Sequence, residues 1–286
     1  NPVTSPKPKM GVLGTATKVP APTPSLGAHP QPPHPFGETI ESSDGTTPGH
    51  VPHRQLTERA GKPKSLVRAL RDPLVRHHAS QERLERSKER RAALKALGLE
   101  KQAASLKRFP TNPDTRKGNL AEVFLAEYVA AVTTTSLPVY RLRHNPNVDQ
   151  SMKGDDVLAF DLDSKPMRIV VGEAKFRATS TKAAVQDVID GLLRSHQAVI
   201  PVSLQFVADK LSEAGDEKTS ARVLECAHLI ALGKLRPEYV GLLMSDIKAA
   251  DRVNATSVAF PARLALISLG LSSPEETVDA CYDGLK

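Results

Sequence analysis

The sequence of 286 residues contains no tryptophan, only two cysteines and an aromatic content of 4%. So few aromatic side chains argue against a single-strand nucleic-acid binder that stacks bases on aromatic platforms. Cys226 and Cys281 lie far apart, with no CxxC pair and no histidine at ligand spacing. This spacing suggests neither a disulfide framework nor a zinc site, so we expect two buried thiols in a reducing cytoplasm.

Long apolar segments are also missing. No run of about eighteen apolar residues occurs, and the first residues lack the apolar core of a signal peptide. We therefore predict a soluble, cytoplasmic protein without a membrane-spanning segment. The hydrophobic content of 40% is sufficient for a sizeable buried core.

Composition divides the chain into three parts. Residues 1–53 are rich in proline, threonine, serine and glycine, and we predict a disordered tail there. Residues 54–108 carry 16 lysines and arginines against 6 acidic residues, a net charge of +10, in a sequence of helix formers. We predict a basic helical arm for this segment. Residues 109–286, with a net charge of about −3, have the pattern of a folded domain.

The basic arm has two interpretations. It is a solvated helix stabilised by pairs such as Glu82 with Arg86, or it binds phosphates or a partner protein through its positive charge. Basic runs are common, so the arm alone does not separate these alternatives.

The pattern of residues 109–286 predicts a mixed α/β domain, with a central sheet covered by helices on both sides. Asn119 is the expected N-cap of the helix NLAEVFLAEYVAAV, and VSLQFVADKL fits either a helix or a strand. The other expected helices are residues 180–198, SARVLECAHLIALG and SSPEETVDACYDGL; the expected strands are VYRLRH, residues 157–162, residues 167–176, EYVGLLMSD and LALISLGL.

The stretch MKGDDVLAFDLDSKPMRIVVGEAKFR predicts a β-hairpin whose outer ends are charged. A symmetric turn at residues 163–166 places Asp156 opposite Glu173. Because side chains alternate along a strand, Lys175 then shares their face and Asp155 faces the other side of the sheet. A bulge or an odd-length loop would exchange the roles of the two aspartates.

Two carboxylates and an ammonium group on one patch suit metal-dependent phosphodiester hydrolysis. Asp156 and Glu173 supply hard oxygen ligands for Mg²⁺, or for Mn²⁺, while Lys175 can orient or deprotonate a water and offset phosphate charge.

The sequence G-D-D before an apolar strand, followed by a second strand ending in E-x-K, resembles the PD-(D/E)XK nuclease superfamily. Within it, RKGNLAEVFLAEYV, EYVGLLMSD and FPARLALISLGLSSPEETVDACYDG are similar to the HamA nuclease subunits of the Hachiman anti-phage system. The resemblance implies a restriction-endonuclease-like fold for residues 109–286, metal ligation by Asp156 and Glu173, a catalytic Lys175 and a supporting acidic Glu122. It also implies DNA as substrate and a helicase as partner.

Two function classes remain open: a Mg²⁺-dependent DNA endonuclease, or a catalytically silent module that binds DNA or a helicase. In addition, Glu122 fits a capping box with Asn119, and Asp156, Glu173 and Lys175 together fit a solvated salt bridge at strand ends.

Overall fold

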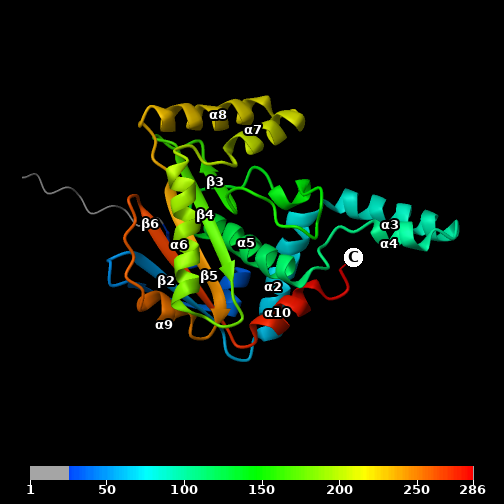
Figure 1. The fold of residues 1–286 in the computed structure, drawn as a ribbon, viewed down its shortest axis with the longest axis horizontal. Coiled ribbons are helices and arrows are strands. Elements are labelled where there is room, and N and C mark those ends of the chain that lie inside the picture. The colour runs from blue at the N-terminus through cyan, green and yellow to red at the C-terminus, as the bar shows by residue number, and fades with distance from the viewer. Residues whose placement is uncertain (1–25, 286) are drawn as a thin grey trace, which may run out of the picture.

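The computed structural model describes residues 26–285, which form a six-stranded mixed sheet with helices on both faces (Figure 1). The strand order is β1-β2-β6-β5-β4-β3. Both outer pairs, β1 with β2 and β3 with β4, are antiparallel, while β2, β6, β5 and β4 run parallel to one another. The predicted mixed α/β architecture is therefore confirmed.

The strands are β1 (Ile40–Thr46), β2 (Pro52–Glu58), β3 (Val157–Asp161), β4 (Arg168–Phe176), β5 (Glu238–Asp246) and β6 (Leu264–Leu271). The helices are α1 (Pro35–Thr39), α2 (Pro63–His78), α3 (Gln81–Ala96), α4 (Glu100–Ser105), α5 (Pro113–Val132), α6 (Lys182–Gln197), α7 (Leu204–Glu213), α8 (Glu217–Ala231), α9 (Ala249–Asn254) and α10 (Pro274–Tyr282), with a 3₁₀ helix at η1 (Arg141–His144). In this part of the chain, no helix has the length and apolar character needed to span a membrane.

The central strands are buried on both faces because each face is covered by helices. All eight residues of β6 are buried, as expected for a parallel strand inside an α/β sheet. Alternate residues of β5 and β6 contribute to two separate cores, with Leu242 and Ile267 in one and Leu243 and Leu266 in the other. The first core contains α2, α5 and α10, and the second contains α6 to α9.

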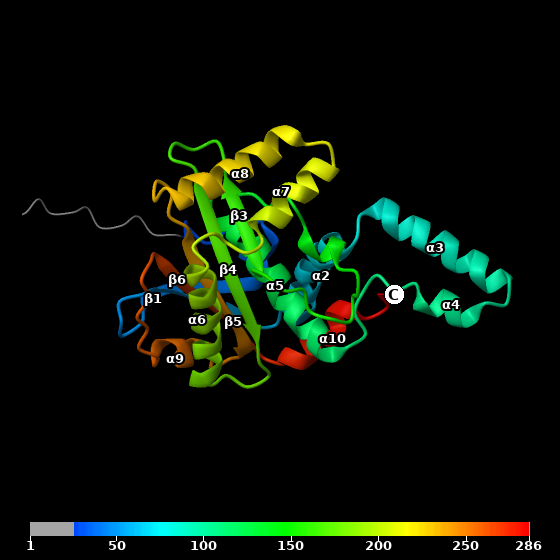
Figure 2. The ribbon, with the colours of Figure 1, turned by 45° about the horizontal axis from the view of Figure 1, so that its top comes forward.

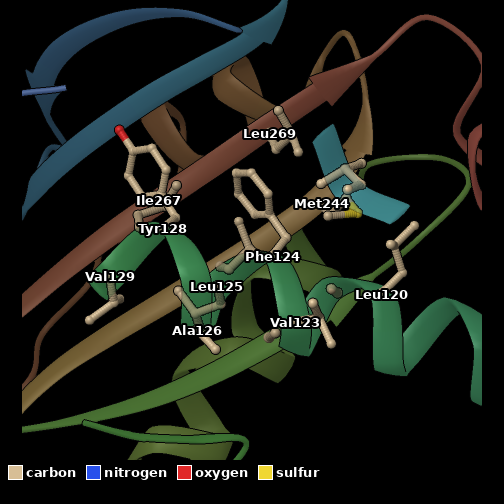
Figure 3. Packing of buried hydrophobic residues seen from close by; sticks show 14 of the residues in the cluster. Leu120, Val123, Phe124, Leu125, Ala126, Tyr128, Val129, Met244, Ile267 and Leu269 are labelled. Atoms are coloured by element: carbon tan, nitrogen blue, oxygen red, sulfur yellow. The ribbon is translucent and has the colours of Figure 1, made fainter. Parts of the chain in front are cut away.

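Helix α5 is the main packing element of the first core. Figure 3 shows Phe124 and Tyr128 of α5 facing the sheet near Ile267 and Leu269. Their rings stack with centroids 5.6 Å apart. The helix begins at the N-cap Asn112, whose side chain accepts hydrogen bonds from the backbone N–H groups of residues 114 and 115. Its packing against the sheet holds the buried Glu122 in place on the same helix.

The N-terminal segment corrects the predicted disordered tail. Residues 1–25 lie outside the described residues, but residues 26–53 contain α1, all of β1 and the start of β2. Arg54 is almost fully buried and donates to Asp44 and to the Tyr128 hydroxyl, at 3.2 Å, which ties both strands to α5. The prediction failed because these strands are polar on their exposed positions, and the pairing of β1 with β2 and of β2 with β6 supplies the order that composition does not reveal.

The basic arm of residues 54–108 is helical over much of its length, but its first part is buried in the protein body and its second part projects from it. Leu66, Leu70 and Leu74 of α2 are fully buried in the first core. Only α3 and α4 project from the body, as a helical hairpin (Figures 1 and 2). Arg91 donates to the Leu106 carbonyl at 2.7 Å and holds this hairpin closed. Strand β2 and helix α2 of this segment therefore belong to the same sheet and core as the residues after Phe109.

Two local expectations are wrong, and one open alternative is resolved. Asn119 is not an N-cap but a buried residue inside α5, 3.1 Å from the His78 ring. VYRLRH forms η1 instead of a strand, and the ambiguous VSLQFVADKL contributes α7. The remaining predicted strands and helices all occur.

Candidate active site

The β3–β4 hairpin has the predicted register. Val157 pairs with Gly172 and Asp161 with Arg168, so a symmetric turn joins the two strands. Pairing with β3 stops at Val157, which leaves the next backbone positions of β4 without a partner on that side, while β5 still pairs with them on the other. Asp156 fills this place, because its Oδ2 accepts a hydrogen bond from the Ala174 N–H at 2.9 Å. The carboxylate is thereby held at the sheet edge, beside the Glu-x-Lys residues.

Glu173 and Lys175 lie on the face of β4 that is covered by α6. The Lys175 Nζ donates a hydrogen bond to Glu173 Oε1. Glu173 packs directly over Gly191 of α6, where an added Cβ would lie 2.4 Å from the carboxyl carbon. The absence of a side chain at position 191 thus provides the space that Glu173 occupies.

Glu122 approaches the same region from α5, on the other face of the sheet. It is buried, and its Oε1 lies 2.9 Å from Arg141 Nε. Burial raises the pKa of Glu122 to about 8; the charge of Arg141 opposes this rise, and those of Asp156 and Glu173 reinforce it. Arg141 also donates to the backbone carbonyls of Met152 and Asp155, so it holds the loop that leads into β3.

The carboxylates influence one another. Burial is the largest cause of the raised pKa of Asp156, although the Ala174 N–H and the charges of Arg141 and Lys175 lower it. Burial is also the largest cause of the raised pKa of Glu173, and the negative charge of Asp156 raises it further. The hydrogen bond and charge of Lys175 lower it. A cation placed between these carboxylates would therefore stabilise their charged forms.

Asp155 points away from this cluster, but not in the expected direction. Its carboxylate accepts hydrogen bonds from the Ser195 hydroxyl at 2.6 Å and from the Ser203 N–H at 2.9 Å, on the α6 and α7 side of the sheet. The prediction that it faces the opposite side is wrong, because β3 begins only at Val157, so Asp155 lies outside the strand and alternation does not determine its direction. Asp155 secures the loop that positions its neighbour.

The cluster opens into a cavity of about 580 Å³. Asp156, Glu173, Lys175 and Glu122 all line it, so the structure brings together the four residues singled out in the sequence. Between residues 26 and 285, no three histidine, cysteine, aspartate or glutamate side chains gather closely enough to hold a metal by themselves. The donor set instead fits Mg²⁺, which commonly takes one or two carboxylates and fills its other positions with water or phosphate oxygens.

Sequence reasoning missed the residues that position the cluster. Arg141 was assigned to a strand, although it lies in η1 and contacts three parts of the site. Gly191 gave one signal, a glycine inside a helical pattern, which often marks close packing of another group. Ser195 and Ser203 carried no signal that separates them from ordinary helix and loop residues.

Comparison with known proteins identifies relatives of the whole fold. The HamA family model matches residues 35–285, a range that contains all six strands and the complete cluster. The chain is also similar to the Hachiman protein HamA of Bacillus cereus, with 29% identity over 258 residues. The aligned region covers 90% of this chain and 93% of that relative.

Proposed function

Because the chain belongs to the HamA family, we propose that it is a Mg²⁺-dependent DNA endonuclease that acts in anti-phage defence beside a helicase. The defence role is supported by the similarity to a Hachiman protein. The nuclease activity is supported by the site, where Asp156, Glu173 and Lys175 meet at strand ends in an open cavity. That convergence is the single observation on which the proposed activity depends.

In this proposal Asp156 and Glu173 hold the metal ion. When bound, Mg²⁺ would polarise the phosphate and lower the pKa of a coordinated water. The Ala174 N–H fixes Asp156, and Gly191 leaves room for Glu173, so both carboxylates are positioned before substrate arrives. Their raised pKa values mean that protons compete with the metal, and we expect cleavage to increase as pH rises.

Lys175 and Arg141 contribute positive charge to the reaction. Lys175 donates to Glu173 and lies at the cavity wall, where its ammonium group can orient a water and offset charge that develops on the phosphate. Arg141 balances Glu122 behind the metal ligands and holds the loop carrying Asp156. Glu122 therefore supports the site electrostatically in our proposal and does not contact the metal.

The fold assignment belongs to the same proposal. The order along the chain is α5 with Glu122, then the antiparallel hairpin with Asp156, then Glu173 and Lys175 at the end of β4. This order supports membership of the restriction-endonuclease-like PD-(D/E)XK superfamily.

The direct test is cleavage of supercoiled DNA by the purified chain, alone and mixed with a candidate helicase partner. We expect nicked and linear products with Mg²⁺ or Mn²⁺ and none with EDTA, because hard oxygen ligands bind hard cations. Full cleavage in EDTA would contradict metal-dependent hydrolysis. Binding of DNA without cleavage under every metal condition, with or without the helicase, would favour the catalytically silent module.

Gly191 provides a test that leaves the reactive groups in place. Gly191→Ala should displace the Glu173 side chain and lower the cleavage rate about tenfold or more, because the new Cβ overlaps its carboxyl group. Gly233→Ala is not a suitable control, since Gly233 has φ of 68°. Gly45→Ala is suitable, because Gly45 lies in β1 outside the cavity and an added Cβ would meet only the flexible end of the Gln55 side chain, and we expect near wild-type cleavage.

A further inference from the structure

The cavity carries more positive charge than the proposed metal chemistry uses. Its wall includes six cationic side chains: Lys117, Arg141, Lys153, Lys175, Arg177 and Arg194. Four of them are paired with carboxylates: Lys117 with Glu275, Arg141 with Glu122, Lys175 with Glu173 and Arg177 with Asp187. These pairs neutralise much of their charge before any ligand arrives.

Lys153 and Arg194 differ from these four. Within the described range, neither side chain has an ion pair or a hydrogen-bond partner, and both are exposed. Lys153 lies in the loop before Asp155, while Arg194 lies on α6, one turn after Gly191. The charge of Arg194 also reaches the cluster, since it lowers the pKa of Glu173. Two unpaired cations from different elements thus line the cavity that contains the proposed catalytic groups.

We propose that Lys153 and Arg194 bind the phosphates that flank the scissile one in a DNA strand. This inference rests on the proposed nuclease function, and it names the part of the substrate that the site grips. A cavity of about 580 Å³ can admit more than one phosphate group. Arginine suits bidentate phosphate contacts, and lysine supplies a point charge. The acidic cluster would repel these phosphates, so cations are needed on either side of it.

The test is binding of a short fluorescein-labelled DNA duplex to the full chain, measured by anisotropy, with Ca²⁺ replacing Mg²⁺ to limit cleavage. The variants are Arg194→Ala, Lys153→Ala and their combination. Each single change should weaken binding about tenfold at low salt, the effect of losing one charged hydrogen bond. Each should also reduce the slope of log affinity against log salt by about 0.9, and the double variant by about twice that amount.

Lys218→Ala is the matched control, because Lys218 is an exposed cation of α8 outside the cavity. It removes the same charge and should leave affinity and slope unchanged. Arg194→Lys, which keeps the positive charge, should retain most of the wild-type slope of log affinity against log salt. Melting temperatures equal to wild type would show that lost affinity does not come from unfolding.

Wild-type affinity and slope in both alanine variants, in a chain that cuts DNA, would overturn the inference and leave the proposed function standing. An equal loss in Lys218→Ala would also overturn it, because the effect would then be net charge alone. If the wild-type chain neither binds nor cuts DNA, with or without a helicase, the proposed function fails and the inference fails with it.

Discussion

Replacing Asp156 with asparagine is expected to lower the DNA cleavage rate at least ~10²-fold, about 2.7 kcal/mol of activation free energy. Asparagine keeps an oxygen that can accept the Ala174 N–H, so the loop and the hairpin should retain their positions. The charge that helps to hold the metal is lost. The cleavage rate with Mg²⁺, measured against wild type, checks this expectation.

The same variant has a second readout that does not depend on activity. Because the folded-state pKa of Asp156 is raised, its protonation favours the folded state at low pH, and this stabilisation is lost as pH rises through the raised pKa. Without metal at alkaline pH, Asp156→Asn should therefore melt at a higher temperature than wild type. Mg²⁺ should raise the melting temperature of wild type but not that of the variant.

Asp155→Asn is the matched control. Asp155 accepts from Ser195 and from the Ser203 N–H, away from Glu173 and Lys175. We expect cleavage within about tenfold of wild type and a lower melting temperature, since a buried charged hydrogen bond is weakened by roughly 1–3 kcal/mol. An inactive Asp155→Asn beside an active Asp156→Asn would mean that the two aspartates have exchanged roles. Full activity in both would place the chemistry elsewhere.

Replacing Lys175 with alanine is expected to have a comparably large effect, at least ~10²-fold on the cleavage rate, for a different reason. The ammonium group is the cationic partner of Glu173, and it is placed to offset charge on the reacting phosphate. Both carboxylates remain in Lys175→Ala. The variant should therefore still gain melting temperature from Mg²⁺, unlike Asp156→Asn.

Lys210→Ala serves as the control for Lys175. Lys210 also pairs with a glutamate, Glu213, at 2.6 Å, but it lies on α7 and does not line the cavity. Its replacement should leave cleavage near the wild-type rate. An active Lys175→Ala would remove the lysine from the mechanism, whereas loss of the Mg²⁺ response in this variant would assign it to metal binding instead.

The part of the site formed by local sequence could be predicted. The symmetric turn and the two apolar runs were sufficient to pair Val157 with Gly172, the last pair of the ladder, which adjoins Asp156 and Glu173. Alternation then placed Lys175 beside Glu173, as the structure shows. These relations depend only on the alternation of side chains along a strand and on the register of the hairpin, and both can be inferred from a single sequence.

The parts that depend on distant contacts could not be predicted in this way. Arg141 of η1, which packs on α2, reaches Glu122 of α5 only through the folded arrangement, and the sequence VYRLRH gives no sign of that geometry. Likewise, β1 and β2 are largely polar; β1 pairs with β2, and β2 pairs with β6 more than 200 residues later, as the pair His53 and Leu266 illustrates. Asp155 was misplaced because the alternation of the strand was extended to a residue two positions before the start of β3.

The position of β2 beside β6 has a consequence for fragments of this protein. In the complete sheet β6 is an interior strand, with β5 on one side and β2 on the other. A fragment that begins at Phe109 would lack β1 and β2 and would expose the backbone N–H and C=O groups along one side of a strand whose residues are all buried in the complete fold. Such an open edge is a template for pairing with another molecule, and the fragment should self-associate even though every residue of the candidate active site is present.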